Sequence, residues 1–329
     1  MYKRFAYTLA LLPLLVGAVA VRAGEIRIGV VGLDTFHATQ FTQLFNDPKS
    51  PGHVSGGRVV AGFRGGSPDL ELSRLRLDEV TRQMTEKFGV KLHASIEELV
   101  QSVDAIMIES VDGRPHLDQF RRTLGAKKPV FIDKPMTGSL RDAVEIVRLA
   151  RATGTPCFSS SALRYSPNSP VLQREKTGPV RSVYSYGPAE IEPHHPDLYW
   201  YGIHAVEALY AVIGAGCVQV VRTQTDSTDI VTGLWTEGRM GTVQGNRGHD
   251  KRYGVTVFGA KATVTGGDKS SLQPLAVKVM EFFQTGIAPV PLEETLELLA
   301  FMEAADESKR RGGAKVTIAE VLRAAGAQP

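Results

Sequence analysis

The stretch Ile26-Arg27-Ile28-Gly29-Val30-Val31-Gly32-Leu33-Asp34-Thr35-Phe36-His37-Ala38-Thr39-Gln40 decides the fold of this chain. Residues 26–31 are mostly β-branched and apolar, which predicts a buried parallel strand. A glycine turn at Gly32 follows, and then a segment with helical character that extends through Leu44. Strand, glycine turn and helix in this order predict the first unit of a dinucleotide-binding fold, whose turn normally reads G-x-G-x-x-G.

Two of the three glycines of that turn are replaced. With Gly32 as the first glycine, Asp34 stands at the second position and His37 at the third. The second glycine lets the backbone approach a pyrophosphate, and the helix N-terminus behind it favours an anion. A carboxylate in that place would repel the phosphate by about 1–4 kcal/mol. Asp34 instead suits a helix N-cap, or a contact to sugar hydroxyls or to a cation. The fold therefore predicts a dinucleotide site, whereas the turn argues against ordinary NAD binding.

Residues 1–23 have the pattern of a signal peptide. Lys3 and Arg4 precede the almost wholly apolar segment 5–21, and Val21-Arg22-Ala23 resembles a cleavage site. A membrane anchor is the alternative, but the apolar run is short and contains a proline and a glycine. We therefore expect export to the periplasm or the extracellular space. Soluble NAD(P) is scarce there, which also argues against a dehydrogenase that exchanges its cofactor.

Charge and composition limit the partners of the mature chain. The formal charge of the whole sequence is +3, and cleavage after Ala23 removes three basic residues and no acidic ones, leaving 0. A neutral chain lacks the basic surface that binds nucleic acid or anionic membranes. The two cysteines, Cys157 and Cys217, lie in apolar surroundings and are expected to be buried thiols rather than a disulfide. About 306 residues remain, enough for two domains.

The ends of three further predicted strands carry polar residues. Strand 58–63 is followed by Arg64, at the position where a Rossmann fold usually has the acid that holds the ribose. Arg64 either suits a 2′-phosphate or is a solvated loop residue. Strand 104–109 ends at Glu109, and its loop contains Asp112, Arg114 and His116. Because ligands lie beyond the carboxyl ends of parallel strands, these side chains are expected near an active site.

The strand 129–132 ends in Asp133-Lys134-Pro135. A lysine between an acid and a proline at a strand end is unusual for a simple surface charge. The proline restricts Lys134 to an extended or turn conformation and allows a cis peptide bond. A helix over 143–151 and a strand over 157–161 are expected to complete the first domain and begin the second.

The second half predicts a mostly antiparallel sheet, because short alternating runs are separated by turn residues: 180–186, 218–224, 230–236, 240–245 and 254–258. A helix is expected to begin near Gly202 and an amphipathic helix to span 292–308. The densest polar cluster of the chain lies between the first two runs; it consists of Glu190, Glu192, His194, His195, Asp197, Tyr199, Trp200, Tyr201, His204 and Glu207.

Three interpretations of that cluster remain open. Aromatic rings beside carboxylates and imidazoles are a common sugar-binding composition. The same groups could hold a divalent metal, although their spacing matches no known metal signature. The third alternative is a purely structural role. The rarity of so many buried titratable groups without a function argues against it.

The strand–turn start, Asp133-Lys134-Pro135 and the segment Tyr201-Gly202-Ile203-His204-Ala205-Val206-Glu207-Ala208-Leu209 together resemble the Gfo/Idh/MocA family of sugar and cyclitol oxidoreductases. The similarity extends over essentially the whole mature chain. It implies that Lys134, in place of the lysine of the family's Glu-Lys-Pro, lies near the nicotinamide and the reacting carbinol. It also implies that His204 is the active-site histidine and that the second sheet forms a dimer interface. His116 falls where the family often has a histidine and is expected to contact substrate. Arg164 is either a substrate or structural contact or a simple ion-pair residue.

This chain departs from the family at three places. The glycine turn is interrupted at Asp34 and His37, Arg64 replaces the ribose-binding acid, and Trp200 replaces an aspartate four residues before His204. Lys134 and His204 still form a plausible proton-transfer pair.

The sequence therefore predicts an α/β protein with a Rossmann-like domain at 24–155, a substrate and oligomerisation domain at 156–290, and a C-terminal helical segment at 291–329 that packs back on the first domain. Three functions remain: an oxidoreductase for a carbohydrate or cyclitol that uses NAD or NADP, a non-redox sugar-processing enzyme with or without a metal, and a secreted carbohydrate-binding protein. The expected catalytic residues are Lys134 and His204. The expected cofactor contacts are Gly32, Asp34, His37, Arg64, Glu109 and Asp133. The expected substrate contacts are His116, Arg164, His194, His195, Asp197, Trp200 and Tyr201.

Overall fold

The opening strand forms β1 (Ile26–Val31), at the centre of a six-stranded parallel sheet. A computed structural model describes residues 24–248, 251–268 and 270–327, so the signal-peptide prediction lies outside the described residues. The strand order is β3-β2-β1-β4-β5-β6. The other five strands are β2 (Gly57–Phe63), β3 (Lys91–Leu92), β4 (Ala105–Ile108), β5 (Val130–Asp133) and β6 (Cys157–Ser160). The Rossmann-like prediction is confirmed.

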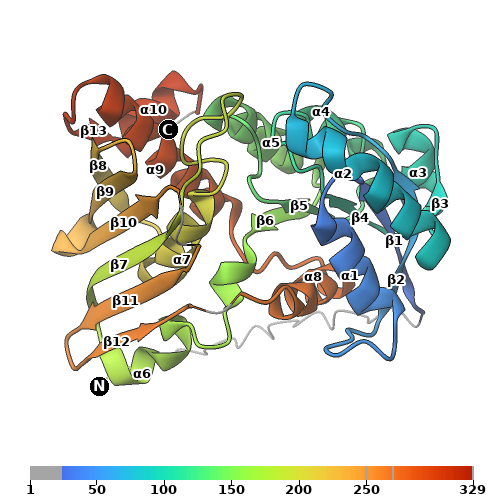
Figure 1. Ribbon diagram of the computed structural model, residues 1–329, viewed down its shortest axis with the longest axis horizontal. Helices are drawn as coiled ribbons and strands as arrows, with labels where there is room; N and C mark the ends of the chain where they lie inside the picture. Colours follow the sequence, from blue (N-terminus) through green and yellow to red (C-terminus); the bar gives the residue numbers. More distant parts are fainter. Residues whose placement is uncertain (1–23, 249–250, 269, 328–329) are drawn as a thin grey trace, which may run out of the picture.

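Helices cover both faces of this sheet (Figure 1). They are α1 (Phe36–Asn46), α2 (Glu71–Arg82), α3 (Ile96–Ser102), α4 (His116–Arg121), α5 (Leu140–Thr153) and α8 (Gln273–Thr285). Helix α8 comes from the second half of the chain but packs on the first sheet, where Phe282 contacts Phe158 with ring centroids 4.9 Å apart. The parallel sheet is thus completed by a distant segment.

The prediction for the start of the first helix requires correction. Thr35, and not Asp34, is the N-cap of α1, since its hydroxyl accepts a hydrogen bond from the His37 N–H at 3.3 Å. Helix α2 begins at Glu71 and continues into a π-helical turn at Gln83–Lys87. Ser95 is the N-cap of α3, where its hydroxyl accepts a hydrogen bond from the Glu98 N–H.

The second sheet has the strand order β12-β11-β7-β10-β9-β8-β13. Its strands are β7 (Val180–Pro188), β8 (Cys217–Gln224), β9 (Thr228–Trp235), β10 (Met240–Asn246), β11 (Gly254–Gly259), β12 (Thr263–Gly266) and β13 (Val316–Thr317). All adjacent pairs are antiparallel except β7 and β10, which are parallel. The prediction of a mostly antiparallel sheet is confirmed.

Helices α7 (Ile203–Ile213) and α9 (Leu292–Arg310) lie between the two sheets (Figure 1). Helix α9 contacts β8 on one side and α5 and β6 on the other. Buried residues of both sheets belong to one continuous apolar cluster, in which Trp235, Tyr210 and Phe301 stack against one another. Each such fully buried side chain contributes roughly 1.5–3 kcal/mol. The shared core fixes the relative placement of the two sheets.

Shorter helical segments connect these elements: Leu124–Ala126, Ala162–Tyr165, Pro170–Gln173, α6 (Arg174–Thr177), Thr236–Gly238 and α10 (Ile318–Ala324). Both cysteines are free and buried, as predicted. The Lys134–Pro135 peptide bond is cis. None of the helices in the described part of the chain has the length and apolar character needed to span a membrane.

Candidate functional site

A pocket of about 200 Å³ lies where the two sheets' helices and loops meet. The start of α1, the β4 and β5 ends and the start of α7 supply its walls. Its lining residues are Thr35, Phe36, His37, Gln40, Leu72, Arg76, Val111, Lys134, Trp200, Tyr201 and His204. The fold thus brings both expected catalytic residues, Lys134 and His204, into one cavity with the expected contacts His37, Trp200 and Tyr201. Residues about 170 positions apart meet there because ligand sites form beyond the carboxyl ends of parallel strands.

His204 is held by a neighbouring serine. Its Nδ1 lies 2.7 Å from the hydroxyl oxygen of Ser161, which follows the end of β6. Burial lowers the pKa of His204 well below its usual value, and the positive charges of Lys134 and His37 lower it further. The imidazole is therefore neutral near pH 7 and can accept a proton. Nothing in the local sequence marked Ser161; its position after a strand end is the signal that could have found it.

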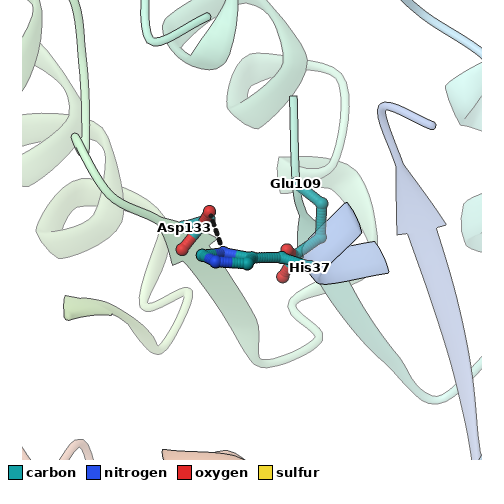
Figure 2. A group of neighbouring side chains, drawn as sticks. All are labelled: His37, Glu109 and Asp133. Carbon is teal, nitrogen blue, oxygen red and sulfur yellow. Dashed lines mark hydrogen bonds and ion pairs between the residues drawn. The ribbon is translucent and has the colours of Figure 1, made fainter. Parts of the chain in front are cut away.

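Beside the pocket, His37 meets two carboxylates at the ends of neighbouring strands (Figure 2). The His37 Nδ1 lies 2.8 Å from Oδ2 of Asp133, the last residue of β5. Glu109 follows β4 and is fully buried. Burial and the adjacent Asp133 raise the pKa of Glu109 well above its usual value. Burial alone would also raise the pKa of Asp133, but the contact with His37 outweighs it and brings that pKa to about 2.

Asp34 is fully buried and does not face the pocket. One carboxylate oxygen accepts a hydrogen bond from the Val111 N–H at 3.0 Å, and the other accepts from the Ser73 hydroxyl at 2.6 Å. The Ser73 oxygen in turn accepts from the Ser67 N–H at 2.8 Å. Burial raises the pKa of Asp34. Asp34 therefore joins the β1 turn to the loops after β2 and β4.

Gly32 serves the same packing. Its φ is +92°, and a Cβ atom there would lie 2.5 Å from the backbone nitrogen of Ser110. Glycine is therefore required for the close approach of the β1 turn to the loop that follows β4.

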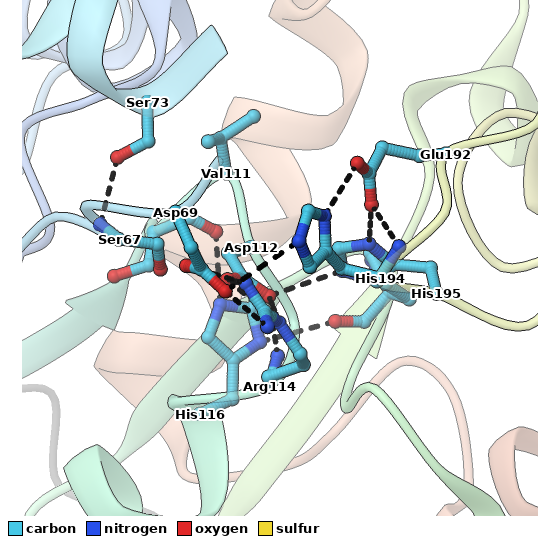
Figure 3. Close-up of polar contacts among 12 residues, drawn as sticks. Ser67, Asp69, Ser73, Val111, Asp112, Arg114, His116, Glu192, His194 and His195 are labelled. Atoms are coloured by element: carbon cyan, nitrogen blue, oxygen red, sulfur yellow. Dashed lines mark hydrogen bonds and ion pairs between the residues drawn. The ribbon is translucent and has the colours of Figure 1, made fainter. Parts of the chain in front are cut away.

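Five charged residues, which we call the loop clasp, join the loops after β2 and β4 to segment 189–202 of the second domain; they are Asp69, Asp112, Arg114, Glu192 and His195 (Figure 3). The Arg114 guanidinium donates to Asp112 at 2.7 Å and to Asp69 at 2.8 Å. The ring of His195 lies between Asp112, at 3.0 Å, and Glu192, at 2.9 Å.

The pKa shifts of the clasp residues agree with their ion pairs. Burial alone would raise the pKa of Asp112, but hydrogen bonds from His195 and Arg114 hold it far below its usual range. Burial would lower the pKa of His195, and the bonds to Asp112 and Glu192 outweigh it and raise the pKa. His194 lies beside the clasp and contacts Glu192 at 2.8 Å. The sequence placed some of these residues near a site but did not predict that they would bind one another.

Four more expected site residues also lie outside the pocket. The His116 ring is buried, 2.9 Å from the carbonyl oxygen of Ser110 and 3.0 Å from that of Pro135, so it connects two loops. Arg64 pairs with Asp78 on the surface.

The other two are held by partners on the second domain. Arg164 pairs with Glu207 and Glu294, each at 2.6 Å. Asp197 pairs with Arg222 at 2.8 Å and Lys309 at 2.6 Å. Neither side chain lines the pocket.

Residues 26–160 match a family model described as an oxidoreductase family with an NAD-binding Rossmann fold. The N-terminal domain is therefore similar to the NAD-binding domain of the Gfo/Idh/MocA family of oxidoreductases. The match covers β1 to β6 and includes the modified turn and Asp133-Lys134-Pro135.

Solved structures share the fold of both domains. An oxidoreductase from Agrobacterium radiobacter, in complex with NAD⁺, L-tartaric acid and magnesium, is 16% identical, covers 91% of this chain and 100% of its own, and has a TM-score of 0.69. The scyllo-inositol dehydrogenase of Lactobacillus casei is 15% identical, covers 90% of this chain and 98% of its own, and has a TM-score of 0.72.

The myo-inositol 2-dehydrogenase of Lactobacillus plantarum is 14% identical, covers 89% of this chain and 99% of its own, and has a TM-score of 0.70. At these identities the likeness describes the fold. No curated protein matches the sequence.

Proposed function

We propose that this Gfo/Idh/MocA protein is an enzyme that acts on a small carbohydrate or cyclitol by proton transfer in the pocket of Lys134 and His204. The observation that carries the proposal is the convergence of both residues, from different domains, on one cavity. The neutral His204 ring, oriented by Ser161, is suited to take a proton from a substrate hydroxyl or carbon acid. The Lys134 ammonium is suited to stabilise the oxyanion that then develops.

The lining supports a polyhydroxylated substrate. Trp200 and Tyr201 offer apolar ring faces for sugar C–H groups, and Gln40 and Arg76 offer hydrogen-bonding groups for hydroxyls. The inositol dehydrogenases that share the fold point to the same class of ligand.

The residues at the turn do not fit a dinucleotide in the usual Rossmann pose, and no step is assigned to one. Asp34 fills the second glycine position, and its carboxylate is already bonded to Ser73 and Val111. The clasp ties down the loop after β2, where a Rossmann fold usually has the acid that holds the ribose. The pocket of about 200 Å³ is also smaller than ordinary small-molecule sites, which span about 300–1,000 Å³. These features favour elimination or hydrolysis over hydride transfer.

A nicotinamide-dependent sugar or cyclitol oxidoreductase is the second candidate. The family match over residues 26–160 favours it, together with the retained Lys134 and His204. Under that function NAD or NADP would have to bind in a different pose or after the clasp opens.

The deciding experiment measures cofactor content and turnover on the same preparation. Purified protein is denatured and the supernatant analysed by mass spectrometry, and native protein is titrated with NAD and NADP. Non-redox chemistry predicts no nicotinamide release and turnover of a glycoside or cyclitol panel without added cofactor. Lys134→Ala should lower kcat at least 100-fold, whereas Lys91→Ala, on the surface, should not.

Release of about one equivalent of NAD or NADP would contradict the non-redox function and support the oxidoreductase. Sugar affinity without any turnover, unchanged by Lys134→Ala, would instead indicate a binding protein.

We also propose export of the mature chain, on the strength of the pattern in residues 1–23. Sequencing of the N-terminus from a cell-envelope or culture fraction should begin at Gly24. Recovery of the intact N-terminus in the cytoplasmic fraction would contradict export.

A further inference from the structure

We propose that His37, Glu109 and Asp133 form a binding site for a divalent transition-metal ion, with Mn²⁺ and Zn²⁺ as the best matches. Across the described ranges, they are the one group of three His, Cys, Asp or Glu residues whose ligand atoms converge, all within 4.8 Å of one another (Figure 2). The site does not depend on the proposed function, because it rests only on the geometry of these three side chains and the burial of the two carboxylates.

The first argument is burial without compensation. Glu109 is 0% exposed and Asp133 is 3% exposed. Both oxygens of Glu109 and Oδ1 of Asp133 lack a hydrogen-bond partner in the part of the chain that the structure describes. Buried carboxylates are normally paired or bound to metals, because an uncompensated charge in the interior is very unfavourable. These three oxygens are therefore suited to bind a cation.

Two other ways to neutralise the pair leave the oxygens unsatisfied. A protonated Glu109 would remove one charge, but in the part of the chain that the structure describes neither Glu109 oxygen forms a hydrogen bond. Lys134 is close enough to affect the charge of Glu109, but within the described ranges it forms no ion pair with Glu109 or Asp133. An ion can bind all three oxygens and the imidazole at once.

The ligand chemistry indicates which ions fit. Imidazole suits zinc and other transition metals, while carboxylates also suit manganese; magnesium and calcium prefer sites made only of oxygen. The 2.8 Å separation of His37 Nδ1 and Asp133 Oδ2 suits adjacent ligands, since two atoms about 2.1 Å from one ion at right angles are about 3 Å apart. Three protein ligands leave open positions, as in catalytic zinc sites.

The site is also placed for use. His37 lines the pocket that contains Lys134 and His204, so an ion held there would lie against the bound ligand. A sugar's vicinal hydroxyls could fill its open positions. The histidine that interrupts the glycine turn would then have a role of its own.

The experiment measures binding without any substrate. Metal-stripped mature protein is titrated separately with MnCl₂, ZnCl₂ and MgCl₂ by calorimetry, and its thermal midpoint is recorded at each concentration. We expect one Mn²⁺ or Zn²⁺ per chain and a rise of several degrees in the midpoint at saturation, with a weaker response to Mg²⁺.

Two nearly isosteric variants, Glu109→Gln and Asp133→Asn, should weaken binding about 100-fold or more and abolish the metal-dependent rise. Without metal, Glu109→Gln should be no less stable than the wild type, because it removes a buried charge. The matched control is Glu192→Gln, in the other histidine–carboxylate cluster, which should retain the full metal-dependent rise.

The absence of stoichiometric binding for all three ions would overturn the site, as would a full metal-dependent rise in both Glu109→Gln and Asp133→Asn. Equal loss of the rise in Glu192→Gln would place the ion in the clasp instead and also overturn this assignment. Binding without sugar turnover would leave the metal site standing and contradict only the proposed function.

Discussion

Asp34 shows how one substitution changes the role of a turn. A carboxylate at the second glycine position accepts two hydrogen bonds from buried donors, the Ser73 hydroxyl and the Val111 N–H. The turn that opens to a phosphate in a dinucleotide-binding protein is here closed by contacts within the chain. The residue acts as a structural acceptor between three loops.

Removal of this carboxylate should destabilise the fold. In Asp34→Ala the Ser73 and Val111 donors lose their acceptor, which costs about 1–3 kcal/mol for each buried donor left unsatisfied. Urea unfolding followed by circular dichroism measures the loss, with Asp226→Ala, at an exposed position, as control. Equal stability of Asp34→Ala and the wild type would contradict the assigned contacts.

Ser161 is expected to be a positioning residue for His204. Its hydroxyl lies 2.7 Å from Nδ1, so Ser161→Ala should lower kcat about 10- to 100-fold with little change in KM, since the ring loses its orientation. Ser161→Thr, which keeps the hydroxyl, should restore most of kcat. A change confined to KM, or no rescue by threonine, would argue for another role.

At the scale of elements, the loop clasp connects the ends of β2 and β4 to segment 189–202. Arg114 is the centre on the first domain, and His195 is the contact from the second. The ion pair of Arg114 with Asp69 lies partly in solvent, so it contributes little to stability. The pair of Asp112 and His195 is buried. The buried pair therefore dominates closure of these loops.

The clasp predicts a pH dependence of stability. The pKa of His195 is raised in the folded state by Asp112 and Glu192, so its contribution is fully present below the unfolded pKa of about 6.5 and is lost as pH rises through the folded value. The urea midpoint should accordingly contain a component that falls as pH rises above about 6.5. His195→Asn should remove that component; an unchanged pH profile in His195→Asn would contradict it.

At the scale of the whole molecule, α7 and α9 cover one face of the second sheet, and the other face carries exposed apolar side chains. One row across β11, β7, β10 and β9 consists of Phe258, Ser182, Met240 and Leu234. Three of these are large, apolar and more than a third exposed. Exposed apolar side chains gathered on one sheet face are typical of a surface that binds another protein.

We expect this face to join two copies of the chain. Met240→Lys and Leu234→Asp, on neighbouring strands, should convert a dimer into monomers because each places a charge in an apolar contact. Multi-angle light scattering after size-exclusion chromatography measures the mass; Thr225→Lys, at an exposed turn, is the control. A wild-type monomer at high concentration would contradict the expectation.

The sequence by itself determined the two-domain α/β fold. Local periodicity, which needs no distant partner, predicts strands at runs such as 26–31 and 104–109 and at the alternating segments of the second sheet. The cap at Ser95 likewise depends only on residues close in the sequence. Short motifs that resemble a known family also led to the prediction that Lys134 and His204 are site residues, and the pocket has both in its lining.

Only the tertiary structure decided what the polar residues bind. Asp34 meets Val111 across 77 positions and His37 meets Asp133 across 96, and neither contact is written in the sequence near those residues. In the same way, Asp197 pairs with Arg222 and Lys309, which lie 25 and 112 positions away in the sequence. The charge of a side chain follows from its residue type, whereas its hydrogen-bond or ion-pair partner depends on how the strands and loops converge in space.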